Sequence, residues 1–586
     1  MKFNILGINP GHNGSAALIS DGEVVFYVEE ERLTRMKYDG NPFRGMLEVL
    51  KHWHVDVLVI AGTGQEEHRL PWTGEDAYSA LVRKFNPAVR VIRLGHEHHL
   101  GHAAGAFYNS GFDKAIALVV DGAGSLKTEK INEQMEIQGF EAESVWLCEY
   151  PGKFSLIHKA YGNNSGQKFD TGAFSFDSAV TITKAYEAVS QYLGFGFIEA
   201  GKTMGLAPYG RKDDNIPSLF LGNRGSKDVF LPSYPAGAYV DQFRIKYLAQ
   251  NKDPKDWHRS PEKLTDVEKN LAWQIQHDTQ KLVGDYVENA LRTVPDVTNV
   301  VFAGGYGLNC VANYYLVKRF PHINFYVDPI AHDGGTSIGV AKLIWHTERE
   351  DETIRPQTSI YYGPEYSADE LKAVLDKNSN KIATKSVTKH EIAQMIADRN
   401  IVSIFQGRSE AGPRALGNRS ILYDPRDPDG KETVNTVKGR EWFRPFAGSC
   451  LVEDANDWFD MAGMKESPFM MYAVNVAADK VHEIPNITHV DETCRVQTVS
   501  EESNKHYYEL IKEFKNITGV PVLFNTSFNL AGDPLVETLD DALDTLYRSK
   551  LKYLYLPELS LLVEKTIEDP KDEKIVINTT NDMIEM

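Results

Sequence analysis

Cysteine is scarce in this chain of 586 residues, and its scarcity limits the kinds of site that the chain can contain. The four cysteines, Cys148, Cys310, Cys450 and Cys494, lie far apart and form no CxxC pair. This spacing excludes a cysteine-based zinc site and fits a reducing compartment, in which thiols stay free. We therefore expect the cysteines to pack in the interior.

Long apolar runs and basic residues are also in short supply. No stretch is long enough to span a bilayer, and the opening MKFNILGINPGHNGSAAL lacks the basic-then-apolar pattern of an export signal. We expect a cytoplasmic protein without a membrane partner. The 63 Lys and Arg face 82 Asp and Glu, a formal net charge of −19. This charge disfavours broad binding to nucleic acid, although a local basic cleft could still hold phosphates.

The alternation of strand-like and helical segments predicts an α/β fold. Apolar stretches such as VDVLVIAG and KAIALVVDGAG alternate with helical ones, and Asp21-Gly22 suits a tight hairpin turn. The chain exceeds what one core normally supports, and a charged, polar stretch near residues 348–387 separates two α/β units. We predict a first domain over 1–350, a linker and start of the second domain over 351–387, a second domain over 388–566 and a polar tail over 567–586.

A histidine-rich helix start, HEHHLGHAAGAFY, raises the question of a metal site. His98 and His102 are four residues apart, so a helix would place both imidazoles on one face. Histidines at a helix start often only cap it or face solvent, so the pair needs further ligands. Asp121 and Asp333 each follow a predicted strand, where carboxylates point into the cleft of an α/β sheet, although either could simply form a cap or turn. Two His and two Asp would suit a borderline divalent cation such as iron or zinc.

The second half of the chain carries the densest positive charge. Its glycine- and proline-punctuated segments QGRSEAGPRALGNRSILYDPRD and NTVKGREWFRPFAGS contain Arg408, Arg414, Arg419, Lys438, Arg440 and Arg444. Guanidinium groups bind phosphate bidentately, so several converging on a cleft would hold a phosphorylated substrate; pairing with surface carboxylates is the alternative. The segment FNTSFN adds neutral donors and acceptors suited to an adenylate, or to a satisfied β-edge: Asn525, Thr526, Ser527 and Asn529.

A strand, a glycine turn and a helix start follow one another in TNVVFAGGYGLNCVAN. This order suits an anion or nucleotide that rests on backbone N–H groups at the helix N-terminus. Taken alone, a Gly-Gly turn is weak evidence for such a site.

Eight motifs in a fixed order resemble those of one known family. They are HNGSAALISDG, EERLTRMKYD, HHLGHAAGAFY, GKTMGLAPYG, FAGGYGLNCVAN, QGRSEAGPRALGNRSIL, REWFRPFA and PVLFNTSFNLAGDPLV. Across nearly the whole chain they resemble the O-carbamoyltransferases of the nodulation and antibiotic-tailoring type. The resemblance implies an N-terminal domain of the actin-like (ASKHA) superfamily, similar to the subunit that transfers threonylcarbamoyl in tRNA modification, joined to a C-terminal YrdC-like domain.

The resemblance also implies a two-step reaction. The YrdC-like domain would convert carbamoyl phosphate and ATP, with Mg²⁺, to carbamoyl-adenylate and pyrophosphate, and the N-terminal domain would transfer the carbamoyl group to a hydroxyl. The acceptor stays open between a small metabolite and a hydroxymethylated pyrimidine such as 5-hydroxymethylcytosine in DNA or a nucleotide. Residues 161–178 and 211–262 would form its pocket, or pack as ordinary insertions. Homodimerisation is left open as well.

Matching motifs imply roles for individual residues. The metal ligands would be His98, His102, Asp121 and Asp333, with Fe(II) expected and Zn or Mn as alternatives. Nucleotide contacts in the transfer domain would come from Lys202, Gly304, Gly305 and Asn309. In the adenylating domain Arg414, Arg444 and Lys438 would be catalytic, and substrate and adenylate would be bound by Arg419, Arg495, Asn525, Thr526 and Ser527.

The chain departs from the family pattern at a few positions. His12-Asn13 stands where His-Asp is usual, so His12 becomes the nearer candidate for the general base, with a turn or phosphate contact as the alternative. Gly448 replaces a commoner proline, and Asp533 a commoner glutamate. An actin-like ATPase or kinase, or a nonenzymatic nucleotide-binding regulator, are the alternative functions.

Overall fold

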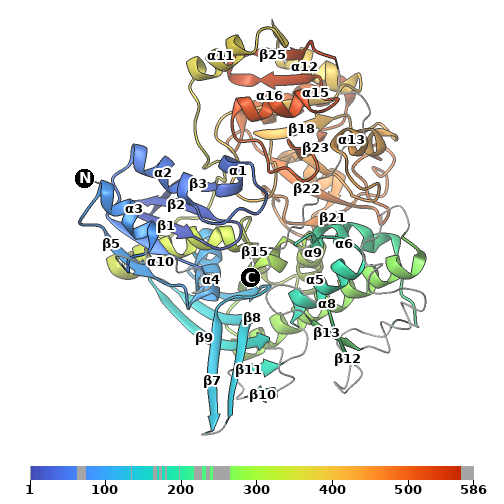
Figure 1. Ribbon diagram of the computed structural model, residues 1–586. Coiled ribbons are helices and arrows are strands. Elements are labelled where there is room, and N and C mark those ends of the chain that lie inside the picture. Colours follow the sequence, from blue (N-terminus) through green and yellow to red (C-terminus); the bar gives the residue numbers. More distant parts are fainter. Residues whose placement is uncertain are drawn as a thin grey trace.

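The computed structural model describes residues 2–62, 74–132, 135–162, 168–170, 174–177, 181–196, 198–214, 216, 228–231, 238–241 and 264–568. Most of the predicted acceptor region, 161–178 and 211–262, and nearly all of the predicted polar tail lie outside these residues. Helices and mixed sheets alternate along the described chain, so the predicted α/β fold class is confirmed (Figure 1).

The first sheet belongs to the N-terminal part of the chain, and its strand order is β3-β2-β1-β4-β5. Its strands are β1 (Asn4–Asn9), β2 (Ser15–Ser20), β3 (Glu23–Glu29), β4 (Val57–Ile60) and β5 (Arg90–Arg93). β2 pairs antiparallel with β1 and β3, whereas β4 pairs parallel with β1 and β5. Asp21 and Gly22 form the β2–β3 turn with φ of 48° and 89°, because a two-residue hairpin of this kind needs positive φ at both positions.

A second sheet repeats this plan. Its central strands are β6 (Lys114–Val120), β8 (Met135–Glu149), β9 (Lys153–Gly162), β14 (Asn299–Ala303) and β15 (Asn324–Val327). They lie in the order β9-β8-β6-β14-β15. The first three pair antiparallel, and β14 pairs parallel with β6 and β15, as in the first sheet. This duplication is the arrangement expected of an actin-like domain.

Helices α4 (His98–Ser110) and α10 (Thr336–Arg349) pack against each other between the two sheets. They touch backbone to backbone, because a Cβ atom added at Gly339 would lie 1.9 Å from the carbonyl oxygen of Gly101. Any larger residue at this crossing would push the helices apart. The contact therefore determines how far the N-terminal end of α4 lies from the turn that precedes α10.

A third, mixed sheet forms the C-terminal half, in the order β16-β25-β24-β17-β18-β23-β19-β22-β21-β20. The strands that matter for the site are β18 (Arg419–Tyr423), β19 (Ala447–Leu451), β22 (Thr493–Val499) and β23 (Val522–Ser527). The others are β16 (Ile382–Ser386), β17 (Val402–Phe405), β20 (Phe459–Asp460), β21 (Ala473–Val476), β24 (Tyr553–Leu556) and β25 (Leu561–Lys565). Helices α11 (Ala368–Lys377), α12 (Lys389–Ala397), α13 (Gly430–Lys438), α15 (Lys505–Thr518) and α16 (Leu539–Tyr547) accompany them. That this half is YrdC-like, and that the domains divide near 348–387, stay predictions.

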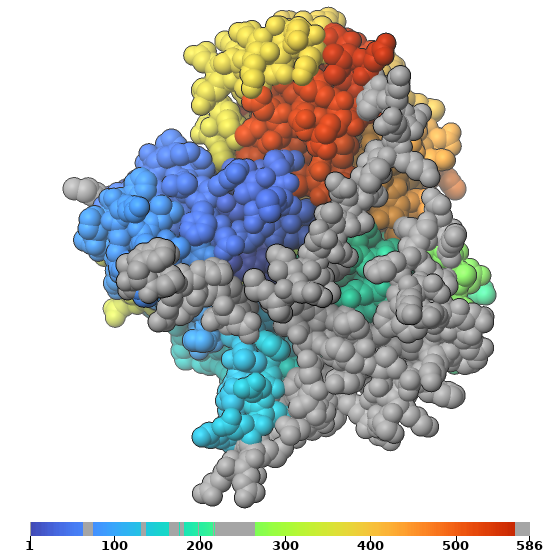
Figure 2. All heavy atoms as spheres, viewed as in Figure 1, coloured from blue at the N-terminus to red at the C-terminus, as the bar shows by residue number. Residues whose placement is uncertain are grey.

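The two halves are in close contact (Figure 2). One buried apolar cluster extends from Ile116 in β6 to Leu562 in β25. Across the junction, Asn313 in α9 (Cys310–Arg319) donates to the Met471 carbonyl at 2.9 Å. All four cysteines are free and buried, as predicted. Within the described chain, no helix is long and apolar enough to cross a membrane.

Candidate functional site

The first cluster of interest lies where α4 begins. His98 and His102 project from its first turns, and both side chains are almost fully buried. Their Nε2 atoms are 3.1 Å apart, and the two rings meet edge to face at 84°. The four-residue spacing thus places two imidazole nitrogens beside one point in space, as the sequence suggested.

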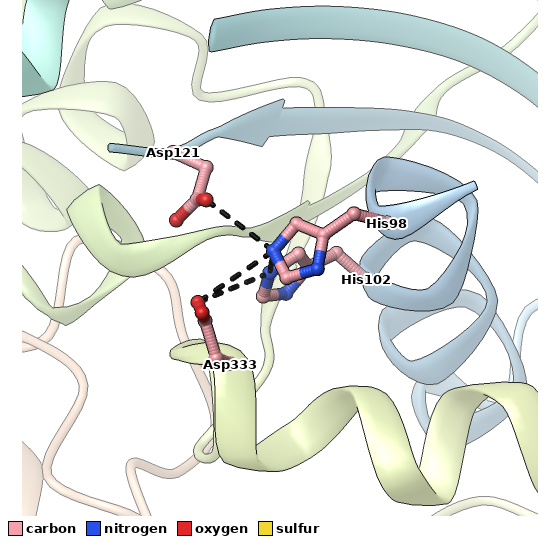
Figure 3. A group of neighbouring side chains, drawn as sticks. All are labelled: His98, His102, Asp121 and Asp333. Carbon is pink, nitrogen blue, oxygen red and sulfur yellow. Dashed lines mark hydrogen bonds and ion pairs between the residues drawn. The ribbon is translucent and has the colours of Figure 1, made fainter. Parts of the chain in front are cut away.

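Two aspartates complete this cluster from other elements (Figure 3). Asp121 follows β6, and one of its oxygens lies 3.5 Å from Nε2 of His98. Asp333 lies in the turn before α10, and its Oδ1 is 3.7 Å from Nε2 of both histidines. One ligand atom from each of the four residues lies within 4.8 Å of every other. The structure therefore brings together all four predicted metal ligands, which we call the His–Asp cluster.

The donor set and its spacing fit a divalent cation. Four ligands placed roughly 2.1 Å from a tetrahedral ion lie about 3.4 Å from one another. Two imidazoles and two carboxylates suit a borderline cation rather than a hard one such as Mg²⁺. The four residues would therefore hold an ion after small side-chain adjustments.

Electrostatics keep both carboxylates ready to bind a cation. Burial raises the pKa of Asp333, but the neighbouring His12 and His98 outweigh it and hold that pKa well below its ordinary value. The pKa of Asp121 is likewise lowered, because the hydrogen bond from His98 and the nearby His102 outweigh burial and the charge of Asp333. Two ionised carboxylates in an enclosed site attract positive charge strongly.

The glycine turn after β14 positions one of the aspartates. The backbone N–H of Gly305 donates to Oδ1 of Asp121 at 2.9 Å, which leaves the other oxygen facing His98. The side chain of Asn309 caps α9 by accepting from Ala312 N–H and also bonds to Gln276. The turn predicted to contact nucleotide thus supports the His–Asp cluster. Its role in nucleotide binding stays a prediction.

His12 lies at the open edge of the cluster. Its Nδ1 is 3.3 Å from the second oxygen of Asp333, and half of its side chain is exposed. An imidazole that donates from Nδ1 to a carboxylate leaves Nε2 free to accept a proton. This placement suits the predicted general base.

The second cluster is built by the third sheet. Arg495 on β22 and Asn525 on β23 both pair with Ala447 on β19, so they flank the same point of the middle strand. Arg414 before β18, Lys438 at the end of α13, and Arg440 and Arg444 in the segment after it lie close enough to act electrostatically on one another or on Arg495. Arg440 donates to the Thr526 hydroxyl at 3.3 Å, and Lys438 donates to Ser527 and to Asn529. We call Arg414, Lys438, Arg440, Arg444 and Arg495 the cation pocket.

Among the described residues, nearby carboxylates do not balance the positive charge of the cation pocket. In the described chain, Arg444 alone among the five pairs with an acid, Glu441 at 3.6 Å. Burial first, and then Arg495 and Arg444, lower the pKa of Arg414 to about 9. Burial and the neighbouring cations also lower the pKa values of Lys438 and Arg440. Such a cluster favours the binding of an anion, since like charges repel strongly when partly desolvated.

Two other arginines of the same motifs have structural roles. Arg419 is fully buried, donates to the carbonyls of Gln406 and Gly407, and lies 3.7 Å over the Phe405 ring. Its guanidinium is thus used internally, which argues against the predicted substrate-binding role. Arg408 similarly donates to the backbone of Val25 in the N-terminal half. The sequence alone could not distinguish these two structural arginines from the arginines of the cation pocket, because all of them lie in the same short motifs.

The two clusters lie close to each other across the junction. Arg414 donates to the Leu308 carbonyl at 2.9 Å, three residues after the Gly305 that holds Asp121. Lys202 lies 2.7 Å from both Glu199 and Glu441 and so bridges the halves, and its predicted contact with nucleotide stays a prediction. The sequence did not predict this bridge, nor the buried Glu143, whose pKa is raised to about 7 by burial beside Asp121.

Known proteins and family models match this chain over most of its length. A family model described as "Carbamoyltransferase N-terminus" matches residues 76–342, and one described as "Carbamoyltransferase C-terminus" matches 393–565. The nodulation protein NolNO of Sinorhizobium fredii is 31% identical, over 96% of this chain and 80% of its own. The 3'-hydroxymethylcephem-O-carbamoyltransferase of Amycolatopsis lactamdurans is 25% identical, over 92% of this chain and 95% of its own. A crystal structure of full-length HypF is 12% identical with a TM-score of 0.31, over 58% of this chain and 55% of its own. The two matched segments contain all four residues of the His–Asp cluster and all five residues of the cation pocket.

Proposed function

Because the chain belongs to the carbamoyltransferase family, we propose that it makes carbamoyl-adenylate in the cation pocket and transfers the carbamoyl group to a hydroxyl at the His–Asp cluster. The observation that carries the first half is the unbalanced charge of the pocket, in which four of five cations have no described acidic partner. Phosphates of ATP and carbamoyl phosphate would supply the missing negative charge.

In the adenylation step, water first hydrolyses carbamoyl phosphate to carbamate and phosphate. A carbamate oxygen then attacks the α-phosphorus of ATP, the bond to the β-phosphate breaks, and pyrophosphate leaves from carbamoyl-adenylate. Arg414, Arg444 and Arg495 neutralise the charge that develops on the departing pyrophosphate, and Mg²⁺ accompanies the ATP. Asn525 and Ser527 lie near the C-terminal end of β23 and hold the adenylate by hydrogen bonds.

The transfer step takes place at the His–Asp cluster. A hydroxyl oxygen of the acceptor attacks the carbamoyl carbon, and AMP leaves with the electrons of the broken carbon–oxygen bond. The hydroxyl proton passes to Nε2 of His12, whose other nitrogen is held by Asp333. A divalent ion held by His98, His102, Asp121 and Asp333, with Fe(II) expected, would polarise the carbamoyl oxygen as a Lewis acid.

The acceptor is a hydroxyl compound. The related enzyme from Amycolatopsis is named for a hydroxymethyl group on a cephem, and NolNO is a nodulation protein, so the acceptors to test first are small metabolites with primary or sugar hydroxyls. A hydroxymethylated pyrimidine belongs in the same panel. Screening the panel by mass spectrometry for the mass of one added carbamoyl group would identify the acceptor.

Pyrophosphate release tests the adenylation half. We expect carbamoyl phosphate-dependent release of pyrophosphate from ATP, reduced about 10²-fold or more in Arg414→Ala and Arg444→Ala, because each removes a charge that stabilises the leaving group. Arg399→Ala, which removes an exposed arginine outside the pocket, is the matched control. Undiminished turnover in both pocket variants would contradict the assignment. Formation of ADP instead of pyrophosphate would favour the alternative of an actin-like ATPase or kinase.

A further inference from the structure

No residue of the motif EERLTRMKYD takes part in the proposed reaction, yet the first residues of this motif lie where the two halves of the chain meet. Helix α1 (Glu30–Thr34) follows β3 directly and lies at the junction with the C-terminal half (Figure 1). Glu29, Glu30, Glu31 and Arg32 are all buried, although charged residues are rarely buried unless they have specific partners. The hydrogen bonds and ion pairs of this segment show which parts of the chain it positions.

The N-terminal end of α1 holds the turn that carries Asp333. Glu29 lies 3.4 Å from Nε2 of His332, and Tyr27 donates to the same carboxylate at 3.2 Å. The other ring nitrogen of His332 accepts from the Gly334 N–H at 3.0 Å. Glu29 thus orients an imidazole that braces the turn on both sides of Asp333.

One helical turn later, α1 holds the loop that carries Arg414. Nη2 of Arg32 donates to the carbonyl of Gly412 at 2.6 Å, two residues before Arg414. A Cβ atom at Gly412 would lie 3.0 Å from the Pro329 carbonyl, so this loop also packs directly on the chain that leads to Asp333. Arg35, just after α1, donates to the Leu535 and Pro534 carbonyls at 2.7 and 2.9 Å.

Arg32 is a costly residue to place here. Only 3% of it is exposed, and its Nε and Nη1 have no hydrogen-bond partner in the described chain. Its charge acts on carboxylates from both halves, Glu29 and Glu537. A well-packed apolar side chain would often stabilise such a position better, so stability alone does not account for the arginine.

We propose that Arg32 is a positioning residue that fixes the Arg414 loop against the Asp333 turn, and so aligns the adenylating pocket with the transfer site. The inference rests on the proposed function. Alignment matters because carbamoyl transfer needs the reacting atoms about 3–3.5 Å apart, and a misplacement of about 1 Å can cost 10²-fold in rate.

The distance between the two sites can be measured without knowing the acceptor. Mn²⁺ bound at the His–Asp cluster shortens the ³¹P relaxation time of AMP bound in the cation pocket, steeply with their separation. We expect Arg32→Met to retain Mn²⁺ binding and pyrophosphate release within about twofold, but to lose most of the relaxation effect, with carbamoyl transfer to any acceptor falling about 10²-fold. Arg32→Lys, which can still donate to the Gly412 carbonyl, should recover much of the effect.

Controls keep the outcomes distinct. His102→Ala gives the relaxation baseline for Mn²⁺ outside the cluster, and Arg90→Met removes an exposed arginine far from α1. If Arg32→Met does not fold, Gly412→Ala takes its place with the same expectation, because its Cβ would lie 3.0 Å from the Pro329 carbonyl and so displaces the Arg414 loop from the chain that leads to Asp333. Wild-type relaxation in a folded Arg32→Met or Gly412→Ala variant would overturn the inference alone. Absence of carbamoyl phosphate-dependent pyrophosphate release in the wild type would instead overturn the proposed function.

Discussion

Replacing Gly339 with alanine should push apart the two helices that carry the His–Asp cluster. The new Cβ would lie 1.9 Å from the Gly101 carbonyl oxygen and 2.9 Å from the Gly105 nitrogen. Both neighbours are backbone atoms of α4, which cannot rotate away as a side chain could. The strain must therefore be relieved by moving α4 or α10 as a whole.

The size of this movement follows from contact distances. Carbon and carbonyl oxygen approach to about 3.3 Å at closest, so the two backbones must separate by roughly 1.4 Å at the crossing. His98 and His102 lie on one of these helices and Asp333 immediately before the other. Metal–ligand distances tolerate only about 0.2 Å, so we expect at least a tenfold loss of metal affinity. The overpacking itself should cost about 1–3 kcal/mol of unfolding free energy.

Gly105→Ala is the matched control on the same pair of helices. Its Cβ would lie 3.5 Å from the Gly339 Cα, an ordinary contact, so this variant should keep its metal affinity and gain about 0.5–1 kcal/mol of stability from better helix propensity. Metal affinity measured by titration calorimetry with Zn²⁺, together with urea unfolding, separates the two effects. Wild-type Zn²⁺ affinity in Gly339→Ala would refute the claim that this crossing sets the geometry of the cluster.

Two further predictions concern buried charges. Arg419→Met should lower the free energy of unfolding by about 3–5 kcal/mol in urea, because it leaves the carbonyls of Gln406 and Gly407 and the carboxylate of Glu537 without their partner. Arg399→Met should change it little, and equal effects would show that Arg419 is not structural. The folded-state pKa of Glu143, about 7, is above its ordinary value of 4.5, so the folded protein binds the extra proton and loses roughly 3 kcal/mol as the pH rises from 4.5 to 7. Glu143→Gln should therefore be more stable than the wild type at pH 8 but not at pH 4, and equal stability at pH 8 would contradict this.

The four residues of the His–Asp cluster were predictable as candidate metal ligands from local patterns. A spacing of four residues in a helix and an aspartate at the end of an apolar strand both translate directly into position, since helix and strand geometry repeat regularly. The Asp21-Gly22 turn was predictable for the same reason, because only a few residue pairs accept positive φ at two successive positions.

The arginines show where local patterns stop being informative. Arg414 and Arg419 lie five residues apart in one motif, but one faces the cation pocket and the other bonds to backbone carbonyls inside the sheet. Lys202 was predicted to contact nucleotide, and the sequence did not indicate that it pairs with Glu441, more than two hundred residues away. A side chain's partners come from the fold, and charge alone does not specify them.

By itself, the sequence determined the α/β class, the tight turn and the residue types gathered at each site, since these depend on periodicity and side-chain chemistry within short stretches. Tertiary structure alone decided which cations stay unpaired, how closely α4 approaches α10, and that α1 ties the Arg414 loop to the Asp333 turn. These features depend on contacts between segments hundreds of residues apart, whose distances are fixed only when the sheets and helices pack together.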